Sequence, residues 1–213
     1  MNVTLIDFMG SDLSVVNAAR VSFGKAKDAL DDADKKLISY LARHEHWSPF
    51  AHTAIQFRVT APIFVARQLA KHQVGGAWNE ESRRYIDDEP TVYYPDAWRE
   101  RAENIKQGSG GTLTAGDSWL TDLVYQTAMN DALRAYRSLM KRGVAPEMAR
   151  MVLPQSTMTS WVWSGSLLFF SRVCRLRLDD HAQAETREIA KQIAGWCNKL
   201  FPVSWAALMD QKP

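Results

Sequence analysis

Residues 54–76 read AIQFRVTAPIFVARQLAKHQVGG, and the hydrophobic period of this stretch changes in its middle. The first seven residues alternate between apolar and polar side chains, as in a half-buried strand. Pro62 then suits the first turn of a helix, which we expect over residues 63–73. The glycine pair at residues 75–76 ends that helix. A strand that leads directly into a helix favours a fold of mixed α and β structure.

The remaining chain contains further helical patterns and one further strand pattern. Pro146 opens a short helix that carries Arg150, and residues 157–163 are typical of a strand. Residues 96–117 are polar and contain the run GSGG, so we expect a loop there. The sequence therefore predicts a single α+β domain over residues 1–213, with a small, mostly antiparallel sheet and several helices. The other predicted helices span residues 34–44, 118–141, 166–177 and 181–200.

The composition excludes several classes of protein. The chain has 213 residues, of which 46% are hydrophobic, and this is enough for one substantial core. No apolar run approaches the roughly 20 residues that span a bilayer, so we expect no membrane partner. The first residues lack the basic and apolar regions of a secretory signal, and we therefore expect a cytoplasmic location. A net charge of +2 is too small to indicate binding to nucleic acid.

The residues that commonly form metal or covalent sites do not match a known pattern. The two cysteines, Cys174 and Cys197, are too few for a disulfide framework and lack the spacing of metal ligands. His44 and His46 do not share a helix face, and no cysteine or suitably spaced acid completes a zinc site. The glycine run at residues 108–111 lacks the Lys-Ser/Thr of a phosphate-binding loop. We therefore expect no metal.

The polar stretch NEESRR follows the glycine pair at residues 75–76. Its two arginines suit phosphate or carboxylate, and Ser82 adds a hydroxyl beside them. Asn79 offers a donor and an acceptor to a ring, and Glu80 accepts from a hydroxyl or a ring N–H. These groups together are the ones needed to bind a nucleotide, although a solvated surface loop explains the pattern alone equally well.

Five segments between about residues 10 and 185 share the order of a known family's motifs. They read GSDLSVVNAARVSFG, HEHWSPFAHTAIQFRV, APIFVARQLAKHQVGGAWNEESRRY, PEMARMVLP and LRLDDHAQAE. Together they resemble the flavin-dependent thymidylate synthases, which make thymidylate without a cysteine nucleophile. The resemblance implies an α+β domain that assembles as a homotetramer, with active sites that draw residues from several chains.

The resemblance also implies a reaction. A one-carbon unit would pass from methylenetetrahydrofolate to C5 of deoxyuridylate (dUMP), with reduced FAD as hydride donor and NADPH as the reductant of FAD. Arg177 would be the catalytic residue that lies against the uracil and polarises it. An arginine suits that role because it keeps its charge and its fork is planar.

The resemblance also implies binding roles for the residues that match the family motifs. For dUMP, the resemblance implies Gln68, Lys71, Ser82, Arg84, Arg150 and Arg177. For FAD, it implies Ser22, His46, Lys71, His72, Asn79 and Glu80.

The chain departs from the family pattern at several of these positions. Lys-His-Gln at residues 71–73 replaces the usual Arg-His-Arg, and one extra residue precedes Ser82. Ser166 and Leu168 stand where the family has Asn and Arg, and Ala51 stands where it has Glu. Two other functions therefore stay open. One is a related flavin enzyme that hydroxymethylates or uses another pyrimidine nucleotide, and the other is a non-catalytic nucleotide- or nucleic-acid-binding protein.

Overall fold

The computed structural model describes residues 1–103 and 108–210, so residues 104–107 of the predicted loop lie outside the described part. In chain order, the elements are β1 (Asn2–Met9), α1 (Asp12–Arg20), the 3-10 turn η1 (Val21–Phe23), α2 (Asp32–Arg43), α3 (Ser48–Ala51), β2 (Ala54–Pro62), α4 (Ile63–Leu69), β3 (Gly76–Glu80), α5 (Ala115–Lys141), α6 (Pro146–Ala149), the 3-10 turn η2 (Arg150–Val152), β4 (Met158–Gly165), α7 (Leu167–Arg177), α8 (Ala184–Leu200) and α9 (Pro202–Met209).

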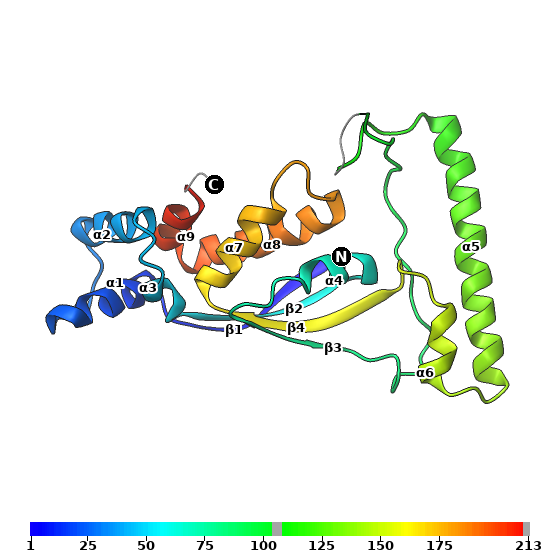
Figure 1. Cartoon of the computed structure of the whole chain (residues 1–213), viewed down its shortest axis with the longest axis horizontal. Coiled ribbons are helices and arrows are strands. Elements are labelled where there is room, and N and C mark those ends of the chain that lie inside the picture. Colours follow the sequence, from blue (N-terminus) through cyan, green and yellow to red (C-terminus); the bar gives the residue numbers. More distant parts are fainter. Residues whose placement is uncertain (104–107, 211–213) are drawn as a thin grey trace.

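The strands form one antiparallel sheet in the order β1-β2-β4-β3. The predicted alternation in β2 places Phe57 and Val59 on one buried face, opposite Trp163 and Trp161 of β4. Helices α4, α7 and α8 lie on the same side of this sheet (Figure 1). The ring of Phe57 packs edge-on against Phe170 of α7, with centroids 5.0 Å apart. The prediction of an α+β fold is therefore confirmed.

A pair of glycines lets α7 pack closely on the sheet. Gly76 of β3 and Gly165 of β4 are register partners, and the ring of Phe169 lies against both. A Cβ atom would lie 2.5 Å from this ring at Gly76 and 2.2 Å from it at Gly165, which is too close for any side chain. The preceding Gly75 has φ +87° and makes the turn into β3. The two adjacent glycines predicted to end the helix therefore have different roles, since Gly75 makes a turn and Gly76 allows the close contact with Phe169.

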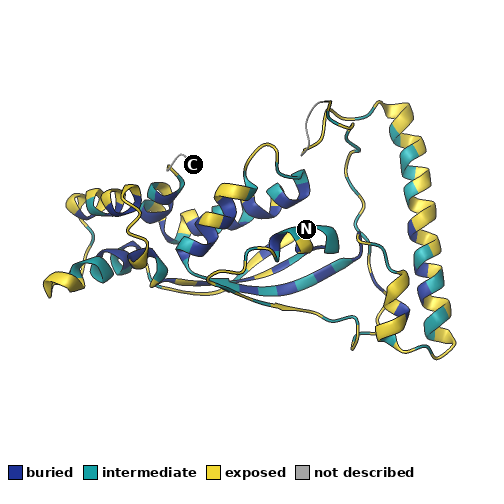
Figure 2. Cartoon of the chain, viewed as in Figure 1, coloured by how far each residue is buried: buried dark blue, intermediate teal, exposed yellow. Residues whose placement is uncertain are grey.

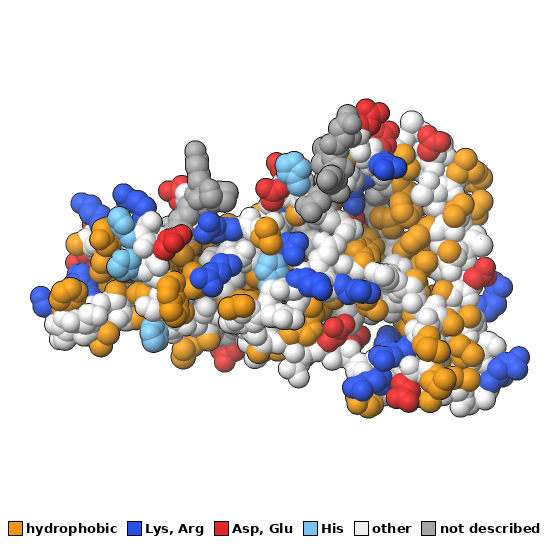
Figure 3. All heavy atoms as spheres, viewed as in Figure 1, with side chains coloured by type: hydrophobic (Ala, Val, Ile, Leu, Met, Phe, Trp, Pro, Cys, Tyr) orange, Lys and Arg blue, Asp and Glu red, His pale blue; other side chains and the backbone are white. Residues whose placement is uncertain are grey.

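Helix α5 stands apart from the sheet and its covering helices (Figure 1). Only Met129, Leu133 and Tyr136 of its 27 residues are buried, and Figure 2 shows its surface as mostly exposed or intermediate. Its first half nevertheless carries large apolar side chains, such as Trp119 at 65% exposure and Val124 at 71%. Figure 3 shows hydrophobic side chains along this helix. None of the described helices, including this long one, could cross a membrane.

Several sequence predictions are confirmed in position and type, and others are wrong. The predicted strands and the helices around residues 34–44, 118–141 and 166–177 match β2, β4, α2, α5 and α7 within a few residues. The helix expected over residues 63–73 ends at Leu69, because the N–H of His72 bonds to the Leu69 carbonyl and closes a turn. The helix expected from residue 181 begins only at Ala184. Strands β1 and β3 and helices α1, α3 and α9 were not predicted.

Candidate functional site

A cavity of about 410 Å³ lies where β3 ends, beside the turn η2. Its lining includes Ser82, Arg83, Arg84 and Arg150, together with Glu80. The short helix predicted to begin at Pro146 is confirmed as α6. Together with η2, it brings Arg150 beside residues that are far away in the sequence. Figure 3 shows Lys and Arg side chains gathered at the end of the molecule where α6 lies.

The arginines of this cavity bond to neutral groups. Arg83 donates to the carbonyl of Asp88, and Arg150 donates to the carbonyl of Glu147 at 3.2 Å. Arg84 donates from Nε to Ser82 Oγ at 3.3 Å. Within the described residues, none of these guanidinium groups forms an ion pair with a carboxylate, and the buried Nε of Arg83 has no hydrogen-bond partner. Glu80 and Glu81 also line the cavity, but its three arginines outnumber them and keep positive charge available for an anion.

Arg177 lies at the last residue of α7, where residues from two other segments hold its guanidinium group. Its Nε donates to Nε2 of His72 at 3.0 Å, and its Nη2 donates to the carbonyl of Gln68 at 3.0 Å. Because Nε2 of His72 accepts a hydrogen bond, the ring is neutral. Burial lowers the pKa of His72, and the charge of Arg177 lowers it further. Burial also lowers the pKa of Arg177 itself. Because the ordinary pKa of an arginine is so high, the group stays charged.

Gln68 connects this arginine to the start of α8. Its Nε2 donates to Oε1 of Gln183 at 2.6 Å, and its Oε1 accepts from the hydroxyl of Thr186 at 3.1 Å. Thr186 is fully buried. Gln183 and Thr186 were not predicted from the sequence. A signal existed only for Gln183, which belongs to the quoted segment LRLDDHAQAE. The predicted Lys71 follows α4 and is exposed, one residue before His72.

Asn79 and Glu80 lie on strand β3 and not on the loop that the sequence suggested. The edge of β4 is free to pair with residues 76–80, and this pairing overrides their polar composition. Asn79 is an exposed strand residue opposite Val162. The carboxylate of Glu80 accepts from the hydroxyl of Thr159 at 2.7 Å and also lines the cavity of Ser82. A residue expected to bind flavin thus lies in the same cavity as residues expected to bind the nucleotide.

Ser22 and His46 lie far from this cavity along the molecule. Ser22 is exposed in η1 after α1, and His46 lies between α2 and α3. Figure 1 shows α1, α2 and α3 at one end of the structure and α5 and α6 at the opposite end. Within one chain, the structure therefore does not bring Ser22 and His46 to the cavity that holds Arg84 and Arg150.

His46 lines a second cavity, of about 200 Å³, between the α2–α3 segment and α7. Leu168, which replaces an arginine of the family pattern, lies in this lining, and so do Arg172 and Arg175 from the same helix. These two arginines were not singled out from the sequence, although their spacing from Leu168 puts them on one helix face. Ser166, the other departure in this region, caps α7 by accepting from the N–H of Phe169 at 3.2 Å.

Both cysteines are buried and free. Burial raises the pKa of Cys174 and that of Cys197 well above the ordinary range of a thiol. Neither sulfur is therefore a thiolate near neutral pH, and neither is a candidate nucleophile. The described residues also contain no group of His, Cys, Asp and Glu side chains arranged to hold a metal ion.

Comparison with known proteins agrees with this fold and with the family resemblance of the sequence motifs. The family model described as "Thymidylate synthase complementing protein" matches residues 4–203. A flavin-dependent thymidylate synthase of Thermus thermophilus is 40% identical over 208 residues, which are 98% of this chain and 75% of that protein. The enzyme of the same name from Thermosipho africanus is 37% identical and covers 96% of this chain and 89% of its own length.

A solved structure is similar over nearly the whole length of both chains. The UMP/dUMP methylase PolB from Streptomyces cacaoi, bound with 5-Br dUMP, has a TM-score of 0.86 and 34% sequence identity. The match covers 97% of this chain and 93% of that one. The chain belongs to the flavin-dependent thymidylate synthase family, which is a family of enzymes.

Proposed function

We propose that this protein is a flavin-dependent thymidylate synthase, which transfers a one-carbon unit from methylenetetrahydrofolate to C5 of dUMP. The observation that carries the proposal is the fixed guanidinium group of Arg177, held by His72 and by the backbone of Gln68. Uracil C5 is a poor nucleophile, so it must be activated. A cation fixed beside the ring stabilises the negative charge that makes C5 reactive.

The state of the cysteines supports this route over covalent catalysis. Attack on C6 of the uracil requires a thiolate, and both Cys174 and Cys197 are buried and protonated. Arg177 keeps its charge at neutral pH and is tied at two of its nitrogens, so little reorganisation accompanies the reaction. In this proposal, neutral His72 orients the guanidinium group and does not add a second charge to the ring.

The cavity beside η2 is the proposed site for the phosphate of dUMP. Arg84, Arg150 and Ser82 would bind the phosphate oxygens. Arg83, which the family pattern did not supply, lies in the same cavity and would also bind the phosphate. Their lack of carboxylate partners among the described residues supports this role, because an anion then binds without first breaking an ion pair. Gln68 and Lys71 would contact the nucleotide from the end of α4.

The residues assigned to the flavin have the chemistry that FAD requires. A pyrophosphate needs cations, and His46 shares its cavity with Arg172. The flavin ring needs donors and acceptors along its polar edge, which Asn79 and Glu80 can provide from β3. When bound and reduced, FAD would supply the hydride, and NADPH is the proposed reductant of the flavin. The proposed flavin residues are Ser22, His46, Lys71, His72, Asn79 and Glu80.

The separation of these residues supports a site built from several chains, and the family resemblance implies a homotetramer. Ser22 and His46 lie at the end of the molecule opposite α5 and α6, so a complete site needs more than one chain. The exposed apolar side chains of α5, such as Trp119 and Val124, suit an interface between copies. Sedimentation of the purified protein should give four copies per particle, and a monomer that binds FAD fully would contradict this assembly.

The mass of the nucleotide product tests the proposed function. Purified protein is incubated with FAD, NADPH, methylenetetrahydrofolate and dUMP, and the nucleotide is then analysed by mass spectrometry. Thymidylate is expected. A hydroxymethylated product would show that the Lys-His-Gln departure redirects the chemistry. Unchanged dUMP would contradict the thymidylate synthase proposal, and a protein that also takes up no flavin would favour a non-catalytic binding function.

A second candidate substrate is UMP. The similar Streptomyces cacaoi enzyme is described as a UMP/dUMP methylase, and its structure superimposes on this chain with a TM-score of 0.86. The same assay with UMP in place of dUMP tests this candidate. Methylation of UMP at a rate close to that of dUMP would assign the broader pyrimidine specificity to this chain.

A further inference from the structure

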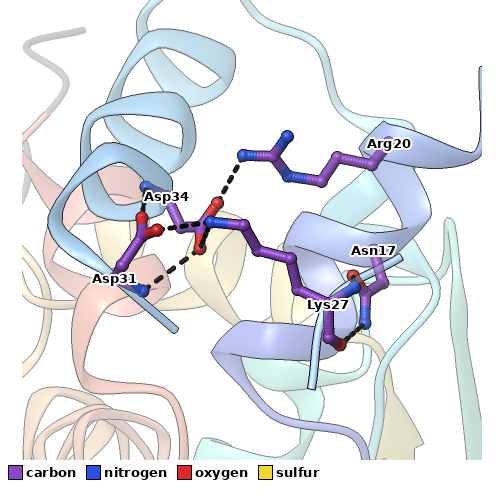
Figure 4. Close-up of polar contacts among 5 residues, drawn as sticks. All are labelled: Asn17, Arg20, Lys27, Asp31 and Asp34. Carbon is purple, nitrogen blue, oxygen red and sulfur yellow. Dashed lines mark hydrogen bonds and ion pairs between the residues drawn. The ribbon is translucent and has the colours of Figure 1, made fainter. Parts of the chain in front are cut away.

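One buried carboxylate joins both ends of the segment that carries Ser22. The side chain of Asp34, in the first turn of α2, has no solvent exposure. Arg20, at the end of α1, donates to it from Nη2 at 2.5 Å, and Lys27 donates from Nζ at 2.9 Å. Figure 4 shows both cations converging on this carboxylate from separate points of the chain. Residues 21–26 therefore form a loop whose two ends share one anchor.

Hydrogen bonds to backbone groups close the same loop. The side-chain amide of Asn17 accepts from the N–H of Lys27 at 2.9 Å and donates to its carbonyl at 2.9 Å (Figure 4). Gly24 adopts a left-handed conformation with φ +62°, and its N–H bonds to the carbonyl of Val21 at 3.0 Å. These contacts leave the tip of the loop in solvent, with Phe23 at 78% exposure.

The buried charge of Asp34 favours the closed loop, because that conformation keeps Arg20 and Lys27 beside the carboxylate. Burial alone would raise the pKa of this carboxyl, but hydrogen bonds from Lys27 and Arg20 hold its pKa far below the ordinary range. The group is therefore ionised at all ordinary pH values. A buried ionised carboxylate is tolerated only while its partners stay in place, so opening the loop would leave an uncompensated buried charge.

We propose that Asp34 is a positioning residue for the flavin site, which holds residues 21–26 in the one conformation that presents Ser22. This inference rests on the proposed function, because it takes Ser22 as a contact of FAD. Asp34 touches neither FAD nor nucleotide in this role and acts through Arg20 and Lys27. The loop tip would bind FAD as a preformed surface and would not be ordered by the cofactor.

The first test compares Asp34→Asn with Asp32→Asn. Asp32 lies on the same helix, has a side chain that is 88% exposed and pairs only with Lys35 in the described structure, so the control removes the same charge. FAD binding is measured by fluorescence titration of the apoprotein, and loop opening is measured as the rate of tryptic cleavage after Lys25. In Asp34→Asn, both the Kd for FAD and the cleavage rate should rise about tenfold or more. In Asp32→Asn, both should change by less than about twofold.

A second variant separates the anchor from the helix cap. Asp34 also accepts from the N–H of Asp31 and so helps to cap α2. Lys27→Met removes the ion pairs of Lys27 with Asp34 and with Asp31, but it keeps the pair between Asp34 and Arg20 and the hydrogen bond from the N–H of Asp31. It should raise the cleavage rate and the Kd for FAD by about threefold to tenfold, and it carries the test if Asp34→Asn does not fold.

Each outcome decides part of the inference. Faster cleavage with an unchanged Kd for FAD would show that the loop does not position the flavin and would overturn the proposal. Unchanged cleavage in both loop variants would show that Asp34 does not hold the loop. A wild-type chain that binds no FAD would instead contradict the proposed function, and the cleavage rates would still decide whether Asp34 holds the loop.

Discussion

Two regions with arginines at the proposed site differ in how their charge is held. Arg177 is fixed by His72 and by the Gln68 carbonyl, and this contact joins the ends of α4 and α7. The arginines of the cavity beside η2, such as Arg84 and Arg150, bond only to neutral groups among the described residues. The first arrangement is complete without a ligand and suits a charge needed in the transition state. The second leaves charge available and suits binding of an anion.

Replacing Arg177 should have the largest effect, because it removes the fixed planar guanidinium group expected to stabilise the reacting ring. In Arg177→Lys, kcat should fall on the order of a hundredfold to a thousandfold, while the Kd for dUMP changes much less. Steady-state rates and calorimetric titration separate these two quantities. A variant with near wild-type kcat would show that the fixed guanidinium group does not activate C5.

Replacing Arg84 should instead weaken binding. A lost charged hydrogen bond costs about 1.5–3 kcal/mol, so the Kd for dUMP should rise roughly tenfold to a hundredfold in Arg84→Ala. Deoxyuridine, which lacks the phosphate, should bind as it does to the wild type. Arg134→Ala is the matched control, because Arg134 is an exposed arginine on α5, paired with Asp131. Equal dUMP affinity in Arg84→Ala and in the wild type would contradict the phosphate role.

A smaller effect is expected from Thr186, which bonds to the side chain of Gln68. Thr186→Val keeps the volume but removes the hydroxyl, so one face of the Gln68 amide loses a neutral hydrogen bond. The KM for dUMP should rise about threefold to tenfold. Thr186→Ser restores the hydroxyl and should recover most of the loss. If the serine variant behaves like the valine variant, packing rather than orientation of Gln68 explains the effect.

The pH dependence of stability should show the smallest effect and tests the neutral state of His72. Burial and the charge of Arg177 depress the pKa of this ring below 6.5. A depressed pKa means that the unfolded chain binds the proton more tightly, so the contribution of His72 is fully present above pH 6.5. It is lost as pH falls from 6.5 through the folded pKa. Thermal unfolding of wild type and His72→Asn between pH 8 and pH 5 measures it, and identical pH profiles would contradict a neutral His72.

The fold was predictable where one element carried a strong pattern of its own. Strand β2 alternates through Phe57 and Val59, and α5 keeps its helical spacing over many turns, so both were predicted. Strand β3 was not predicted, because four of its five residues are small or polar and only the edge of β4 makes them a strand. The early end of α4 at Leu69 was also missed, since nothing in the local sequence before the glycine pair stops a helix there.

The candidate site was predictable only as far as family motifs reached. Those motifs supplied Arg177, Gln68 and Arg84, but periodicity and spacing alone did not place Arg177 beside His72. Gln183 and Thr186 were missed because their roles come from the docking of α8 against α4. The anchor at Asp34 was missed for a similar reason, since its three partners lie on separate turns of the chain.

In the proposed function, this chain makes thymidylate with a fixed arginine and without a thiol. The most direct test is the mass of the nucleotide formed from dUMP by the double variant Cys174→Ala/Cys197→Ala, next to that formed by wild type. Both positions are buried in the core, so the substitutions could disturb folding. Thermal unfolding of the variant is therefore measured to check that it is folded. We expect thymidylate from both proteins at similar rates. Thymidylate from the wild type alone, with a folded but inactive variant, would contradict activation by Arg177 and would assign the chemistry to a cysteine.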